Sequence, residues 1–201
     1  MVRILIAEDM VILRRALVAL LEMEPDLDVV AELSSGDEIV PTAERLNPDV
    51  AVLDIDLPGR DGIEACELLS RTVPGCRSLI LTSLGRPGNL RRALNANAAG
   101  FLLKDTEPEK LAAAIRAVAR GEQVIDPDLA LSTLCAGDNP LSSREIEVLR
   151  LAADGEDITA IARSLYLAVG TVRNYLTAVS VKLNARNRVD AVRIARDAGW
   201  I

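Results

Sequence analysis

Short apolar runs alternate with amphipathic segments over the first 121 residues, and this alternation limits the fold more than any other feature of the chain. The apolar runs, whose length and composition are typical of strands, occupy residues 3–9, 28–33, 49–55, 78–83 and 100–105. Helical spacing of apolar residues marks the segments 12–24, 35–47, 62–73, 88–98 and 107–121. Five such strands alternating with five helices predict a doubly wound α/β fold, in which a five-stranded parallel sheet is covered on both faces.

The pattern changes after residue 121. Residues 122–139, which contain Pro127 and Gly137, show little periodicity and are interpreted as a linker with at most one short helical turn. Residues 140–201 have only helical spacing. We therefore predict three parts: an α/β domain over 1–121, a linker over 122–139 and an all-α domain over 140–201.

The charge of the chain is distributed unevenly between these parts. The whole chain carries a net charge of −7, whereas residues 140–201 hold 9 basic and 7 acidic side chains. An acidic first part and a mildly basic last part favour two domains with different partners, although an excess of two positive charges is also compatible with chance.

Composition excludes several classes of function. The chain has no histidine, which removes Ser-His-Asp and Cys-His catalysis and most zinc sites. Its 3 cysteines, Cys66, Cys76 and Cys135, lack metal-binding spacing and are expected to be free thiols. Aromatic residues are too scarce for stacking single-stranded nucleic acid. Neither a membrane-spanning segment nor a signal peptide is predicted, so we expect a cytoplasmic protein.

Chemically active side chains follow four of the predicted strands. They are Glu8 and Asp9 after the first strand, Asp54 and Asp56 at the end of the third, Thr82 after the fourth and Lys104 after the fifth. The carboxyl ends of parallel strands share one edge of a sheet, where ligands bind near the switch in strand order. Clustered acids require a cation, and a site of oxygen ligands favours Mg²⁺. Taken singly, each of these residues could instead be a helix cap or a solvated charge.

The order of these residues, together with "LPGRDG" (57–62) and "GFLLKD" (100–105), resembles the receiver domain of two-component response regulators, a flavodoxin-like fold. The resemblance implies that Asp54 accepts a phosphoryl group from a sensor histidine kinase. It also implies that Glu8 and Asp9 hold Mg²⁺ together with Asp54, and that Asp56 contributes only its backbone carbonyl.

The same resemblance assigns Thr82 and Lys104 to the phosphoryl oxygens. Phe101 then occupies the aromatic switch position, where the ring turns inward as Thr82 moves toward the phosphoryl group. A plain alternative for Phe101 is a core residue of its strand.

The spacing of Asp54 and Asp56 also resembles the Asp-x-Asp of haloacid-dehalogenase-type phosphatases, in which the second acid is catalytic. That family has Thr or Val two residues after this second acid, where this chain has Pro58. Its motif also lies near the start of the fold, whereas here strands and an acid pair precede it. The receiver interpretation is therefore favoured.

The last part of the chain has the pattern of a helix-turn-helix unit. Ser143 is expected to cap a helix over 144–153, and Asp157 a short helix over 158–165. A turn containing Gly170 precedes a helix over about 171–183. Two short helices joined by a turn commonly place the second helix in the major groove of DNA.

The sequences "GTVRNYL" (170–176) and "KLNARNR" (182–188) resemble the LuxR-type domain of NarL/FixJ-class regulators, especially the subgroup related to DesR. The resemblance places Thr171, Arg173, Asn174 and Thr177 on the DNA side of the recognition helix. It makes Lys182 and Arg188 candidate phosphate contacts. Ala168 departs from the family's usual Ser, which can cap the recognition helix and touch phosphate.

Together these resemblances imply a DNA-binding response regulator rather than an enzyme. Its partners are a sensor histidine kinase and double-stranded promoter DNA, and phosphorylation promotes a homodimer. The helices near 10–21 and 107–120 are implied as the dimer face. A phosphorylation-independent DNA-binding regulator remains the main alternative.

Overall fold

The computed structural model describes residues 1–83, 85–135 and 139–201. The chain forms two compact units. The N-terminal unit comprises Met1–Gly85 and Leu90–Ala130, and the C-terminal unit comprises Leu131–Ile201 with Arg86–Asn89. Gly137, on which the linker prediction drew, lies outside the described residues, as does the side chain of Cys135.

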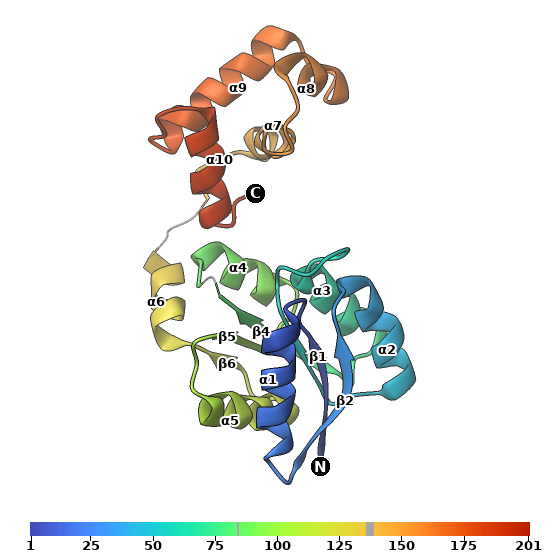
Figure 1. Cartoon of the computed structure of the whole chain (residues 1–201). Coiled ribbons are helices and arrows are strands. Elements are labelled where there is room, and N and C mark those ends of the chain that lie inside the picture. Colours follow the sequence, from blue (N-terminus) through green and yellow to red (C-terminus); the bar gives the residue numbers. More distant parts are fainter. Residues whose placement is uncertain (84, 136–138) are drawn as a thin grey trace. The chain divides into compact units, whose positions relative to one another are not determined.

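The N-terminal unit is built on a parallel sheet with the strand order β2-β1-β3-β4-β5-β6 (Figure 1). The strands are β1 (Val2–Ala7), β2 (Leu27–Leu33), β3 (Val50–Leu53), β4 (Arg77–Thr82), β5 (Gly100–Leu103) and β6 (Val124–Ile125). The predicted parallel sheet is confirmed, but the predicted number of five strands is wrong. The sixth strand, β6, pairs with β5 through the partners Gly100–Val124 and Phe101–Ile125.

Helices cover both faces of this sheet, as the sequence predicts. They are α1 (Val11–Glu22), the 3-10 turn η1 (Gly36–Glu38), α2 (Ile39–Leu46), α3 (Gly62–Thr72), α4 (Pro87–Asn95) and α5 (Pro108–Ala119). Alternate strand residues point to opposite faces. Leu5, Leu53 and Ile80 therefore pack in one core cluster with residues of α2, α3 and α4. Ile4 and Val52 pack in the other cluster with α1 and α5.

The segment predicted as a linker has regular structure over most of its length. Besides β6 it forms helix α6 (Pro127–Cys135), which is longer than the single turn expected. The carboxylate of Asp126 accepts a hydrogen bond of 3.0 Å from the backbone N–H of Leu129 and so caps this helix. A strand of two residues is too short to produce a readable alternation, which explains why the sequence pattern missed it.

The C-terminal unit contains the helices α7 (Ser143–Ala153), α8 (Ile158–Ser164), α9 (Val169–Lys182) and α10 (Arg188–Asp197) (Figure 1). Its side chains form two apolar clusters. One joins Leu149 of α7 to Val179 of α9 and Ala191 of α10. The other joins α7 and α8 to Val172 of α9. Helix α9 contributes to both clusters and is the central element of this unit.

None of the helices in the described ranges has the length and the apolar character needed to cross a membrane.

Candidate functional site

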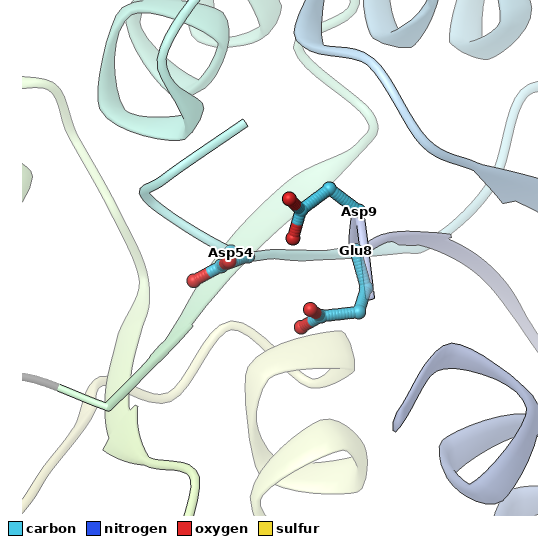
Figure 2. A group of neighbouring side chains, drawn as sticks. All are labelled: Glu8, Asp9 and Asp54. Atoms are coloured by element: carbon cyan, nitrogen blue, oxygen red, sulfur yellow. The ribbon is translucent and has the colours of Figure 1, made fainter. Parts of the chain in front are cut away.

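The acidic cluster predicted from the strand ends forms at the switch in strand order. Strands β1 and β3 are neighbours, and β2 lies on the far side of β1. Because the order reverses there, the loops after β1 and β3 diverge and leave a crevice, where such folds bind ligands. Glu8 and Asp9 follow β1, and Asp54 follows β3. The side chains of Glu8 and Asp9 extend toward Asp54 (Figure 2), and one carboxylate oxygen from each of the three residues lies within 4.8 Å of the others.

Asp54 is held in a single orientation by two contacts. Its Oδ1 accepts a hydrogen bond of 2.8 Å from the backbone N–H of Ile55, and its Oδ2 lies 2.9 Å from Nζ of Lys104. The side chain is only 5% exposed, yet it lies beside the exposed Asp9. A buried and oriented carboxylate that still borders solvent is suited to react with a group delivered from outside.

Lys104 joins the two buried acids of the cluster. Its Nζ lies 2.7 Å from Oε2 of Glu8, in addition to its contact with Asp54. Burial alone would lower the pKa of Lys104, but hydrogen bonds to Glu8 and Asp54 outweigh this effect and raise it. The lysine therefore stays charged and neutralises part of the negative cluster.

Glu8 is the most strongly buried acid of the group, at 1% exposure. Burial raises the pKa of Glu8, and the negative charge of Asp54 adds to this effect. Lys104 and the backbone N–H of Met10 oppose it through hydrogen bonds. The acidic cluster is therefore short of positive charge, as expected of a site that takes up a cation.

Arg14 of α1 is a further residue of this site, and the strand-end pattern did not predict it. Its Nη1 donates a hydrogen bond of 2.6 Å to the backbone carbonyl of Glu8, and its Nε lies 3.9 Å from Oε2 of Glu32. Arg14 thus fastens the loop after β1 to α1 and β2. It was not predicted because it lies on a helix, whereas the prediction considered only residues at strand ends.

The turn after Asp54 explains the sequence "LPGRDG". A Cβ atom on Gly62 would lie 1.8 Å from the backbone oxygen of Asp54, so only glycine allows this close approach. Asp61 then caps α3 by accepting hydrogen bonds of 2.8 Å from the N–H groups of Ile63 and Glu64. Its other carboxylate oxygen binds Arg92 of α4 at 2.5 Å. The loop that carries Asp54 is thereby connected to α3 and α4.

The remaining predicted residues of the N-terminal unit occupy different environments. Thr82 ends β4, is 1% exposed, and accepts a hydrogen bond of 2.8 Å at its backbone oxygen from the N–H of Lys104. Phe101 is 1% exposed and lies in the core. This burial is expected both of a core residue of its strand and of a switch residue whose ring is turned inward. The side chain of Asp56 is exposed and lies outside the acidic cluster.

The donor set of the cluster fits a hard divalent cation. Three carboxylates converge, and Lys104 is their only ion-pair partner among the described residues. Oxygen ligands without cysteine or histidine match the preference of Mg²⁺. The site can therefore hold a metal ion and carry out chemistry at the carboxylate of Asp54.

The C-terminal unit exposes one face of α9. Arg173, Asn174 and Thr177, predicted to face DNA, are exposed, and Thr171 is half-buried. Val172 and Val179, on the opposite side of the helix, are fully buried. The side chain of Arg173 forms no hydrogen bond or ion pair in the part of the chain that the structure describes. The exposed face thus carries a free guanidinium next to an amide, groups that can pair with base edges.

Lys182 and Arg188, the predicted phosphate contacts, have partners inside the unit. Nζ of Lys182 lies 2.7 Å from Oε2 of the buried Glu145. Nη2 of Arg188 donates hydrogen bonds of 2.8 Å and 2.6 Å to the carbonyls of Ala152 and Glu156. Burial alone would raise the pKa of Glu145, but Lys182 and Ser142 lower it through hydrogen bonds. Both cations therefore stabilise the unit, whatever else they contact.

The helix caps of this unit differ from the prediction at one position. Ser142, not Ser143, caps α7 in a reciprocal capping box with Glu145. Asp157 caps α8 as predicted, by accepting hydrogen bonds of 2.8 Å from the N–H groups of Thr159 and Ala160. Ala168 stands at the N-cap of α9 and supplies no side-chain hydrogen bond. Helix α9 begins at Val169, slightly before the predicted start.

Comparison with protein families identifies both units. Residues 4–116 match the family described as "Response regulator receiver domain". Residues 139–195 match the family described as "Bacterial regulatory proteins, luxR family". These matches favour the receiver over the phosphatase interpretation of Asp54 and Asp56.

Individual relatives are similar along their whole length. The chain is 42% identical over 200 residues to the transcriptional regulatory protein DesR of Bacillus subtilis, covering 100% of this chain and 99% of the relative. It is 41% identical over 201 residues to the response regulator RamR of Streptomyces coelicolor, covering 100% and 98%. A solved RcsB–DNA complex shares 27% identity with a TM-score of 0.71, covering 98% of each chain.

Proposed function

The chain belongs to the response regulators that join a receiver domain to a LuxR-type DNA-binding domain, and we propose that Asp54 accepts the phosphoryl group that controls it. Response regulators of this kind are phosphorylation-controlled transcription regulators. The observation that carries the assignment of Asp54 is its buried carboxylate, held by Ile55 and Lys104 at the switch in strand order. Of the acids in the cluster, only Asp54 lies at the end of the central strand β3.

Different residues of the chain have different roles in the proposed phosphoryl transfer. A carboxylate oxygen of Asp54 forms a bond to phosphorus as the bond from phosphorus to the donor nitrogen breaks. Because the chain has no histidine, a phosphohistidine donor must belong to a partner protein, a sensor histidine kinase. Lys104, already 2.9 Å from Asp54, pairs with the incoming phosphoryl oxygens, and the hydroxyl of Thr82 donates to another.

Glu8, Asp9 and Asp54, together with the backbone carbonyl of Asp56, form the proposed Mg²⁺ site. Bound Mg²⁺ neutralises charge between the carboxylates and the phosphoryl oxygens. Burial and the nearby charge of Asp54 raise the pKa of Glu8, and a bound cation would offset both effects. Arg14 and Lys104 hold Glu8 in place for this role.

The output of the protein is binding of promoter DNA through α9. We place Arg173, Asn174, Thr177 and Thr171 against the major groove, since Arg pairs with guanine and Asn with adenine edges. Lys182 and Arg188 are kept as candidate phosphate contacts. Phosphorylation favours a homodimer, so that two copies of α9 meet half-sites about one helical turn apart. The protein then acts in the cytoplasm, where the chromosome is accessible.

Phosphorylation of purified protein with a small phosphoryl donor and Mg²⁺ tests the acceptor. We expect wild type to gain the mass of one phosphoryl group and Asp54→Asn to gain none. The matched control Asp56→Asn, which changes an exposed acid outside the cluster, should still be phosphorylated. Equal phosphorylation of wild type and Asp54→Asn would refute the assignment.

Light scattering after gel filtration, with beryllofluoride and Mg²⁺, tests the link to assembly. We expect a change from monomer to dimer in wild type and none in Asp54→Asn. A dimer of Asp54→Asn that still binds DNA would instead favour the phosphorylation-independent regulator.

A further inference from the structure

Tyr166, in the turn between α8 and α9, has an unusual conformation for its residue type. Its φ is 56°, in the left-handed region, and the residue is 97% exposed. It follows Leu165, the C-cap of α8. Its N–H donates to the carbonyl of Arg163, and the N–H of Leu167 donates to the carbonyl of Ala162. These two hydrogen bonds define a Schellman motif, which requires a left-handed residue at the position of Tyr166.

The other left-handed positions in the described residues are occupied by residues that tolerate this conformation. They are Asn47, Gly59, Asn97, Gly121, Gly155, Asn184 and Gly199. Glycine lacks the Cβ that causes the strain, and the short side chain of asparagine tolerates it. Tyr166 is therefore the exception within this chain. An aromatic residue there costs stability, and because its ring is exposed, packing within the unit does not offset the cost.

The place of Tyr166 suggests what its side chain contacts. It lies three residues before α9, whose N-terminal part approaches the bases when such a helix enters the major groove. Arg163, in the last turn of α8, and Arg173, in α9, lie on either side of this turn in the sequence. Both are exposed, and neither guanidinium forms a hydrogen bond or ion pair in the portion of the chain that is described. Two free cations on the helices that flank the turn favour a negatively charged partner.

We propose that Tyr166 contacts the sugar–phosphate backbone of double-stranded DNA beside the groove that α9 enters. Its phenolic O–H donates to a phosphate oxygen while the ring packs against the adjacent sugar. Tyrosine hydroxyls are among the groups that position proteins on DNA through phosphate contacts. The proposal rests on the DNA-binding function proposed for α9. It explains why a strained aromatic residue stands where asparagine or glycine would be more stable.

The test measures binding of the full-length protein, with beryllofluoride and Mg²⁺, to a labelled duplex of random sequence about three helical turns long. Tyr166→Asn is the main variant, because asparagine suits the left-handed conformation and keeps the motif intact. Tyr166→Phe removes only the hydroxyl. Val189→Asn is the matched control, since it also replaces an exposed apolar side chain of the C-terminal unit, 78% exposed on α10.

We expect Tyr166→Asn to weaken binding about tenfold and Tyr166→Phe to weaken it by less, consistent with loss of a hydrogen bond to a charged group. Because tyrosine is neutral, the dependence of affinity on salt should keep its slope. On a duplex of random sequence the guanidinium of Arg173 acts through phosphate, so Arg173→Ala, by contrast, should reduce that slope by about one. Thermal unfolding of Tyr166→Asn should occur at the same temperature as in wild type or higher, which separates lost contact from lost fold.

The outcomes distinguish the two proposals. Tyr166→Asn with wild-type affinity, in a protein whose Arg173→Ala variant binds weakly, would overturn the contact at Tyr166 and leave DNA binding by α9 intact. Wild type and Arg173→Ala binding equally would overturn the role of α9, and the contact at Tyr166 with it. An equal loss in Val189→Asn would also overturn the proposal, because the effect would not be specific to the turn.

Discussion

Replacing Asp54 by asparagine should stabilise the N-terminal unit when Mg²⁺ is absent. Asparagine keeps the size of the side chain and one oxygen that can accept from the N–H of Ile55, whereas its NH2 group replaces the oxygen that pairs with Lys104. It removes one of three carboxylates whose oxygens lie within 4.8 Å of one another. The substitution therefore removes one negative charge and the ion pair with Lys104 while it leaves the shape of the side chain nearly unchanged.

The size of the effect follows from the distances. At an effective dielectric constant near 20, two unit charges at the upper limit of 4.8 Å interact with about 3.5 kcal/mol. Asp54→Asn relieves this repulsion twice, toward Glu8 and toward Asp9. It loses the attraction of Lys104 at 2.9 Å, about 6 kcal/mol on the same scale. The variant should thus be more stable by about 1 kcal/mol, or about 4 °C in the unfolding temperature of the unit.

With Mg²⁺ bound, wild type should instead be more stable than Asp54→Asn. A cation that binds only the folded protein stabilises it by about 2.7 kcal/mol at a concentration one hundred times its dissociation constant. Wild type should gain this stabilisation, whereas Asp54→Asn, with one ligand fewer, should gain less. After the metal is removed with a chelator, Asp54→Asn should again be more stable than wild type.

Scanning calorimetry is the appropriate assay, because the one tryptophan, Trp200, lies in the C-terminal unit. Its fluorescence reports on the C-terminal unit, whereas Asp54 lies in the N-terminal unit, so the fluorescence transition serves as a comparison for the calorimetric shift. Asp56→Asn, which changes an exposed acid outside the cluster, should leave the unfolding temperature unchanged both with and without Mg²⁺. Destabilisation by Asp54→Asn without Mg²⁺, or an equal shift in Asp56→Asn, would refute this account of the cluster.

Three further predictions concern other parts of the chain. Ser142→Ala removes the capping box with Glu145 and should lower the free energy of unfolding of the C-terminal unit by about 1 kcal/mol, measured by urea denaturation followed through tryptophan fluorescence. Arg116, which donates to Asp26, lowers the pKa of Asp26 to about 2. A lowered folded-state pKa gives stability that is complete above the unfolded value near 3.8 and is lost as the pH falls toward 2. Arg116→Gln should therefore make the free energy of unfolding depend less on pH in this window. A pH profile equal to that of wild type would contradict the role given to Arg116. Ala168→Ser should cap α9, stabilise the unit by about 1 kcal/mol and tighten DNA binding at fixed salt.

Local patterns were sufficient to predict the main elements of both units. The alternation of apolar runs and helical spacing predicted the strands β1 to β5 and the helices that cover them, because burial on one or two faces leaves a period in the sequence. The position of Asp54 and Glu8 just after strands placed them together, because parallel strands end at the same edge of the sheet. The cap at Asp157 was also predicted, since a cap acts within its own turn.

The predictions failed where the deciding contact comes from elsewhere in the chain. Strand β6 forms only because β5 offers a free edge, and two residues carry no readable period of their own. The cap of α7 is a different case, because Ser142 lies three residues before Glu145, and this local spacing of a capping box distinguishes it from Ser143. Arg14 reaches the acidic site from a helix, outside the rule that reads strand ends.

The sequence by itself determined the order of elements, the acids at the strand ends and the pair of helices α8 and α9 joined by a turn, because these depend on short-range periodicity and spacing. Only the tertiary structure decided how the charges pair. In the folded chain Lys104 forms ion pairs with two buried carboxylates. Lys182 and Arg188 bind partners within the C-terminal unit. The tertiary structure also left the ring of Tyr166 exposed in a strained turn. Pairing and exposure depend on residues distant in sequence, and therefore appear only when the chain has folded.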